Sequence, residues 1–145
     1  MKIELTKEQL RSLAKLVFLG NWLANSWRNE DVVEEFDEVE SLVLAAAAKH
    51  GLEDYVEFDD EEKAGPSHEL EEKMSESVDF YNDNTFWDQL IYRMADRDYL
   101  RKYGEEALSE LDTEKGMERE KPLLEKYEKE FNEHGVERLE VRRDN

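Results

Sequence analysis

The stretch from residue 80 to residue 98 gathers side chains that could hold and polarise a small ligand. Arginine and aspartate alternate with aromatic residues in it, and charged groups beside an aromatic pocket are a common basis for ligand binding. Trp, Tyr and Arg are also the types that dominate the centres of protein interfaces. The candidate residues for either role are Trp87, Asp88, Tyr92, Arg93, Asp96 and Arg97. A plainer interpretation is a core helix, with the Arg and Asp side chains forming a network at its rim.

Acidic residues between positions 31 and 38 form the second candidate site. At helical spacing they would make one continuous row, and such a row is most often a solvated outer face. A functional row would dock a basic protein or mimic the phosphates of DNA. The row consists of Asp31, Glu34, Glu35 and Glu38.

Several other chemistries find no support in the sequence. The chain has no cysteine, which excludes disulfides, thiol catalysis and cysteine-ligated zinc. His50 and His134 each precede a glycine at a predicted helix end, and His68 follows a predicted cap, so structural roles explain all three. No nucleotide-binding or nucleophile motif occurs. We therefore predict no catalytic residue, no metal and no cofactor.

The charge distribution narrows the choice of partners. The net charge is −19, and residues 29–65 hold fourteen acidic residues against two basic ones. Phosphates would be repelled, which disfavours direct binding to nucleic acid or to an anionic membrane. The longest apolar run, residues 42–48, is too short to span a bilayer. We expect a cytoplasmic protein with a protein partner. The acidic surface is compatible with a basic partner, and the aromatic residues are compatible with self-association.

Hydrophobic periodicity predicts the helices that would position these residues. Helices are expected over residues 7–28, 31–50, 68–81 and 85–103, with another from Pro122 to Gly135. "NDN" at 82–84 should separate the third from the fourth. The first helix is apolar on all sides, so it should be central and buried. The connections are an acidic loop at 52–66 and a polar loop at 112–121.

These elements predict a mostly α protein with one helical domain over residues 1–145. Four or five helices would surround the first one, and residues 55–58 could pair with 136–141 as a short two-stranded ribbon. The function that the surface favours is a non-catalytic protein-interaction module. The alternatives are a DNA mimic or antitoxin-like inhibitor of a basic nucleic-acid-binding protein, and a ligand-binding protein or enzyme that uses the Arg/Asp cluster.

Overall fold

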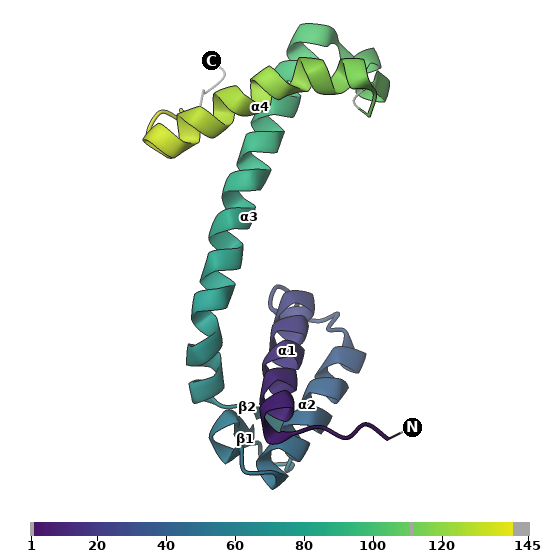
Figure 1. Cartoon of the computed structure of the whole chain (residues 1–145), viewed down its shortest axis with the longest axis vertical. Helices are drawn as coiled ribbons and strands as arrows, with labels where there is room; N and C mark the ends of the chain where they lie inside the picture. The colour runs from purple at the N-terminus through teal and green to yellow at the C-terminus, as the bar shows by residue number, and fades with distance from the viewer. Residues whose placement is uncertain (1, 111, 141–145) are drawn as a thin grey trace. The chain divides into compact units, whose positions relative to one another are not determined.

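The computed structural model describes residues 2–110 and 112–140. These residues are mostly helical, with four α-helices and one two-stranded antiparallel sheet, which confirms the predicted fold class. The chain forms two compact units, residues 1–80 and 81–145. In chain order the elements are α1 (Lys7–Asn25), α2 (Glu34–Lys49), the 3₁₀ helix η1 (Glu53–Tyr55), β1 (Val56–Phe58), β2 (Ala64–Pro66), α3 (His68–Tyr103), the 3₁₀ helix η2 (Glu105–Glu110) and α4 (Glu114–His134) (Figure 1).

Helix α1 starts at a complete capping box. The Thr6 hydroxyl accepts from the Gln9 backbone N–H at 3.2 Å, and the Thr6 N–H donates to the Gln9 side chain at 2.9 Å. These bonds use backbone groups that the first turn of a helix leaves without partners. The helix then lies beside α2 (Figure 1) and buries Ala14 and Phe18.

The link from α1 to α2 is held by side chains that bond to the backbone. Asn25 accepts from the Val33 N–H at 2.8 Å and donates to the Val33 carbonyl at 3.3 Å. Arg28 donates to the Ala24 carbonyl at 2.9 Å and to Asp31. These contacts keep residues 26–33 outside a helix, so α2 starts at Glu34 and not at residue 31 as predicted.

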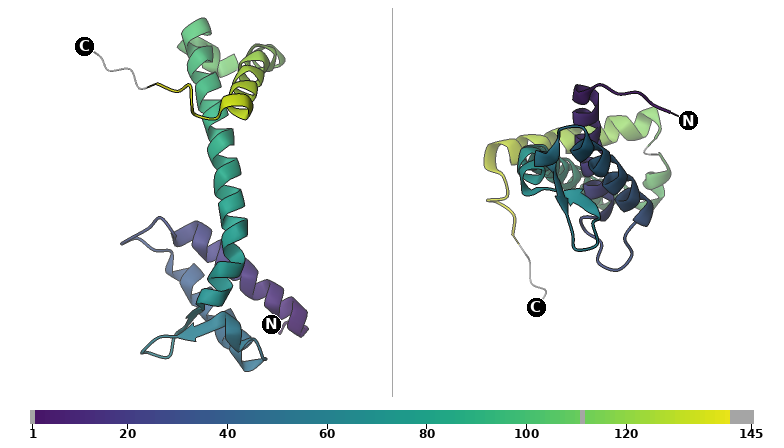
Figure 2. Two further views of the ribbon diagram at one scale, coloured as in Figure 1. Left: turned by 90° about the vertical axis from the view of Figure 1, so that its left-hand side faces the viewer. Right: turned by 90° about the horizontal axis from the view of Figure 1, so that it is seen from below.

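A local hairpin forms the sheet, so the predicted pairing of residues 55–58 with 136–141 is wrong. β1 pairs antiparallel with β2 (Figure 2). In this pairing Val56 lies opposite Pro66. The Asp59 carboxylate closes the turn by accepting from the N–H groups of Glu61 and Lys63. Closing such a short loop costs less entropy than joining distant segments. Residues 136–138 form a turn instead and residues 139–140 belong to no strand, while residue 141 lies outside the described residues.

The core of the first unit joins its two helices to the hairpin. It also takes in the first turns of α3, where Ser67 caps the helix by accepting from the Leu70 N–H at 3.2 Å. Its buried residues are Ala14, Phe18, Leu44, Ala47, Leu52, Tyr55, Val56, Ala64, Leu70 and Met74. The 52–66 segment, predicted as a loop with one short strand, therefore contributes buried side chains as well as turns.

Helix α3 is continuous through the Asn-Asp-Asn stretch, so the predicted break at residues 82–84 is wrong. Asn and Asp disfavour a helix interior by only about 0.7 kcal/mol each relative to Ala. All three side chains are exposed and displace no packing. The strongly periodic segments on both sides therefore continue as one helix.

In the second unit α4 starts at Glu114, so residues 114–121 are helical and not part of a polar loop. Thr113 accepts from the Gly116 N–H at 3.2 Å and caps the helix, which therefore begins well before Pro122 and continues through it. This cap makes the earlier start favourable. One hydrophobic cluster of this unit has Ala95, Tyr127 and Phe131 at its centre, and half-buried residues of α3 and α4 pack against them, namely Trp87, Leu90, Ile91, Met94, Leu123 and Leu124. Tyr99 and Ala107 are buried as well.

Candidate partner-binding surface

Helix α1 is apolar on two opposite faces, and the first unit covers only one of them. Ala14 and Phe18 are buried in the core. Leu16 and Leu23 lie on the other side, where 64% and 53% of their surface is exposed. The prediction of a helix buried on all sides is therefore wrong for its outer face. A helix with this pattern presents surface that usually has a partner.

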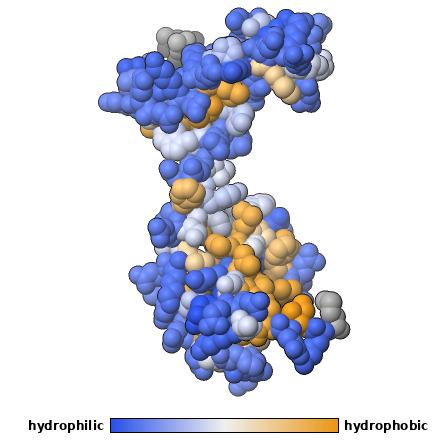
Figure 3. Space-filling model, viewed as in Figure 1, coloured by the Kyte–Doolittle hydropathy of each residue, from blue (hydrophilic) through white to orange (hydrophobic). Residues whose placement is uncertain are grey.

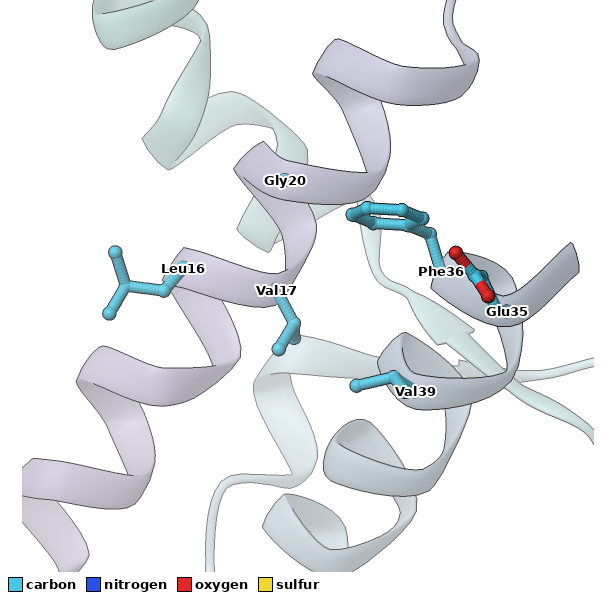
Figure 4. Close-up of a pocket in the computed structure, with 6 residues that line it drawn as sticks. All are labelled: Leu16, Val17, Gly20, Glu35, Phe36 and Val39. Carbon is cyan, nitrogen blue, oxygen red and sulfur yellow. The ribbon is translucent and has the colours of Figure 1, made fainter. Parts of the chain in front are cut away.

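A groove of about 490 Å³ runs between the outer sides of α1 and α2. Val17 and Val39 point toward one another across it, and the Phe36 ring reaches toward α1 near Gly20 (Figure 4). Its six lining residues are Leu16, Val17, Gly20, Glu35, Phe36 and Val39.

The apolar surface extends beyond this groove along both helices. On α2, Leu42 is 71% exposed and lies one turn beyond Val39. Apolar residues gather over α1 and α2 on the side that Figure 3 shows. We call this surface the α1–α2 face and define it by Leu16, Gly20, Leu23, Phe36, Val39 and Leu42.

Carboxylates flank the α1–α2 face, in an arrangement that differs from the predicted row. Glu34, Glu35 and Glu38 are exposed on α2. Asp31 precedes the helix and forms an ion pair with Arg28 at 2.8 Å, so it does not belong to a continuous helical row. The acidic flank therefore consists of three glutamates, of which Glu35 also lines the groove.

A partly buried polar junction joins α1 to α2. The Asn21 amide donates to Asp37 at 2.8 Å and to Glu40 at 2.7 Å. Glu40 is only 7% exposed. Burial raises its pKa, the hydrogen bond from Asn21 lowers it, and the charge of Asp37 raises it further, so the net shift is upward. The junction fixes how the two helices pair, and thereby shapes the groove.

The predicted Arg/Asp cluster forms only in part, and its centre is a residue outside the predicted set. Asp98 has 18% of its side chain exposed and receives hydrogen bonds from Arg97 at 2.9 Å, from Lys126 at 2.9 Å and from the Tyr127 hydroxyl. Burial raises the pKa of Asp98, but these bonds outweigh it and hold the pKa well below its usual range. Lys126 and Tyr127 lie about thirty residues after Asp98 in the chain, and no sequence signal links them to it.

The other predicted site residues do not converge. Trp87 is half-buried, with its ring 5.0 Å from that of Phe86 and 6.0 Å from that of Phe131. Asp88, Tyr92 and Arg93 are exposed. Asp96 is half-buried near Glu120, whose pKa is raised first by burial and then by the charge of Asp96.

Residues 2–110 and 112–140 contain neither a cluster of metal-binding side chains nor a membrane-spanning helix. No group of three or more His, Asp or Glu side chains there is arranged to hold a metal ion. No helix among the same residues combines the length and the apolar character needed to cross a membrane.

Comparison with known proteins gives no assignment, because no protein-family model, no curated protein and no solved structure matches this chain.

Proposed function

We propose that this protein is a non-catalytic interaction module that binds another protein through the α1–α2 face. The observation that carries the proposal is the outer face of α1, where Leu16 and Leu23 stay in water while the opposite face is buried. Full burial of one leucine side chain is worth about 1.5–3 kcal/mol. A partner that covers this surface would gain that energy at several adjacent positions.

The Arg/Asp cluster supports a catalytic or ligand-binding role less well. The Arg97 guanidinium is already engaged by Asp98 and by the Tyr127 hydroxyl at 2.9 Å. Asp88 is exposed. Arg93 is exposed too, and the hollow that it lines has no other charged residue in its lining. These contacts are those of a structural link between α3 and α4.

Site-specific photocrosslinking tests the proposal. Benzoylphenylalanine in place of Leu16 should give one discrete adduct when the labelled protein is irradiated in a lysate of its own source. The same group in place of Glu128, which is exposed on α4, serves as the control and should not give that adduct. Equal labelling at both positions, or no adduct at Leu16, would contradict an interaction surface on α1 and α2.

A further inference from the structure

We infer that the partner of the α1–α2 face is an amphipathic α-helix that carries lysine or arginine along one flank. The inference rests on the proposed function and adds the class of its partner. Three features of the face support it: the kind of backbone that forms it, an unfilled recess at Gly20, and the sign of the charge beside the groove.

Both walls of the groove are helices, which restricts how a partner can bind. Helices bond their own backbone groups internally, so the face has no free strand edge to which an extended peptide could add. A helical partner needs no such edge, because it lays its apolar stripe into a groove with anchors at i, i+3 or i+4, and i+7. Leu16, Gly20 and Leu23 follow that spacing on α1, so they can pack against such a stripe.

Gly20 leaves a recess in the wall of the groove. A Cβ atom built on this residue would meet no atom within 4 Å. Glycine weakens the interior of a helix, and here no close contact within the described chain requires it. A side chain of the partner can occupy the recess, as a knob does between packed helices.

The charge beside the groove favours a basic helix over a second copy of this chain. Glu35 lines the groove, Glu34 and Glu38 stand next to it, and none of the six lining residues is basic. Lysine or arginine on the flank of the partner would therefore meet carboxylates. Two copies of a chain with net charge −19 repel each other instead.

The test uses defined synthetic peptides. The probe is a lactam-bridged helix of about 15 residues, with leucine at i, i+4, i+7 and i+11 and lysine along one flank. One control peptide carries glutamate in place of the lysines, and another carries a central proline that prevents the helix. We expect fluorescence anisotropy to show binding of the lysine peptide, with at least about tenfold weaker binding of both controls.

Gly20→Leu separates binding from folding. The recess can accept the new side chain and leucine favours a helix, so the urea midpoint should not fall. Binding of the lysine peptide should weaken at least about tenfold. Ser77→Leu, at an exposed position of α3, is the matched control and should bind as the wild type does. Undiminished binding by Gly20→Leu would overturn the location of the site.

Glu35→Lys combined with Glu38→Lys tests the charge. The double variant should prefer the glutamate peptide, reversing the wild-type preference. If the wild type binds both helical peptides equally, the basic flank is overturned while an interaction surface remains. If no peptide binds and the Leu16 crosslink joins two copies of this chain, the partner is a second copy. If there is neither binding nor a crosslink, the proposed function fails as well.

Discussion

Replacing Asp98 by asparagine should destabilise the second unit by about 2 kcal/mol, because this carboxylate joins α3 to α4. Its partners are Arg97 on its own helix and Lys126 and Tyr127 on α4. Asparagine keeps an oxygen that can accept one hydrogen bond. It lacks the negative charge that strengthens all three.

The magnitude follows from how exposed each partner is. The side chains of Arg97 and Lys126 are 42% and 58% exposed, so each ion pair contributes only about 0.5 kcal/mol. Tyr127 is buried, and weakening a buried hydrogen bond to a charged group costs about 1 kcal/mol. The Tyr127 bond therefore contributes about half of the total.

A fluorescence assay can observe the second unit alone. Trp87 is the one tryptophan of that unit, since the other two are Trp22 and Trp27. With both of these changed to phenylalanine, urea unfolding followed by Trp87 emission reports on the unit that contains Asp98. Asp88→Asn, at an exposed position of the same helix, is the control and should change stability by less than about 0.5 kcal/mol.

The effect should also depend on pH in a defined direction. The pKa of Asp98 is lower in the folded state than the unfolded value of about 3.9. Its contribution is therefore complete above about pH 4 and is lost as the pH falls toward the folded pKa. The gap between wild type and Asp98→Asn should narrow on acidification. A loss below about 0.5 kcal/mol at pH 7, or a gap that widens in acid, would refute this account of the contact.

Two further predictions concern Glu40 and the middle of α3. Burial raises the pKa of Glu40 in the folded state, so its ionisation destabilises the fold as the pH rises through that pKa. Glu40→Gln still accepts a hydrogen bond from Asn21. This variant should have a higher urea midpoint than wild type at pH 7 and should lose that advantage near pH 4. Asn82→Ala combined with Asp83→Ala should raise stability by about 1 kcal/mol, because α3 is continuous there and alanine is the better helix former. Circular dichroism during urea unfolding would measure the second change, and a fall in stability would indicate the turn that the sequence predicted.

Periodic segments were predictable because their patterns are local. The capping box at Thr6 and Gln9 marked the start of α1, and the apolar repeats placed α1 and α2 to within a few residues. The errors occurred where a weak local signal for a helix end or a helix start was overridden by the surrounding sequence. The sequence from Asn82 to Asn84 resembled a break. Its unfavourable helix propensity is small, however, and the strongly periodic segments on both sides continue through it as one helix. Thr113 caps α4, so the helix begins at Glu114 and Pro122 does not lie in its first turn as the sequence predicted.

The candidate sites were less predictable, because they depend on residues far apart in the chain. The aromatic and charged composition of residues 80–98 was plain, but Asp98 acquired its role from Lys126 and Tyr127, which only packing brings near. The same limit applied to the first unit. Both faces of α1 were apolar in sequence, and nothing in the sequence distinguished the face that would be buried.

The sequence by itself determined the helical class, the acidic surface and the absence of cysteine chemistry, since composition and short-range periodicity suffice for these. Only the tertiary structure decided that α1 packs against α2 and the hairpin, that β1 pairs with β2, and that Leu16 and Leu23 remain exposed. Those outcomes depend on which apolar faces meet, and local sequence patterns do not specify that. The pairing that formed leaves the α1–α2 face uncovered, and this surface is where we expect a partner to bind.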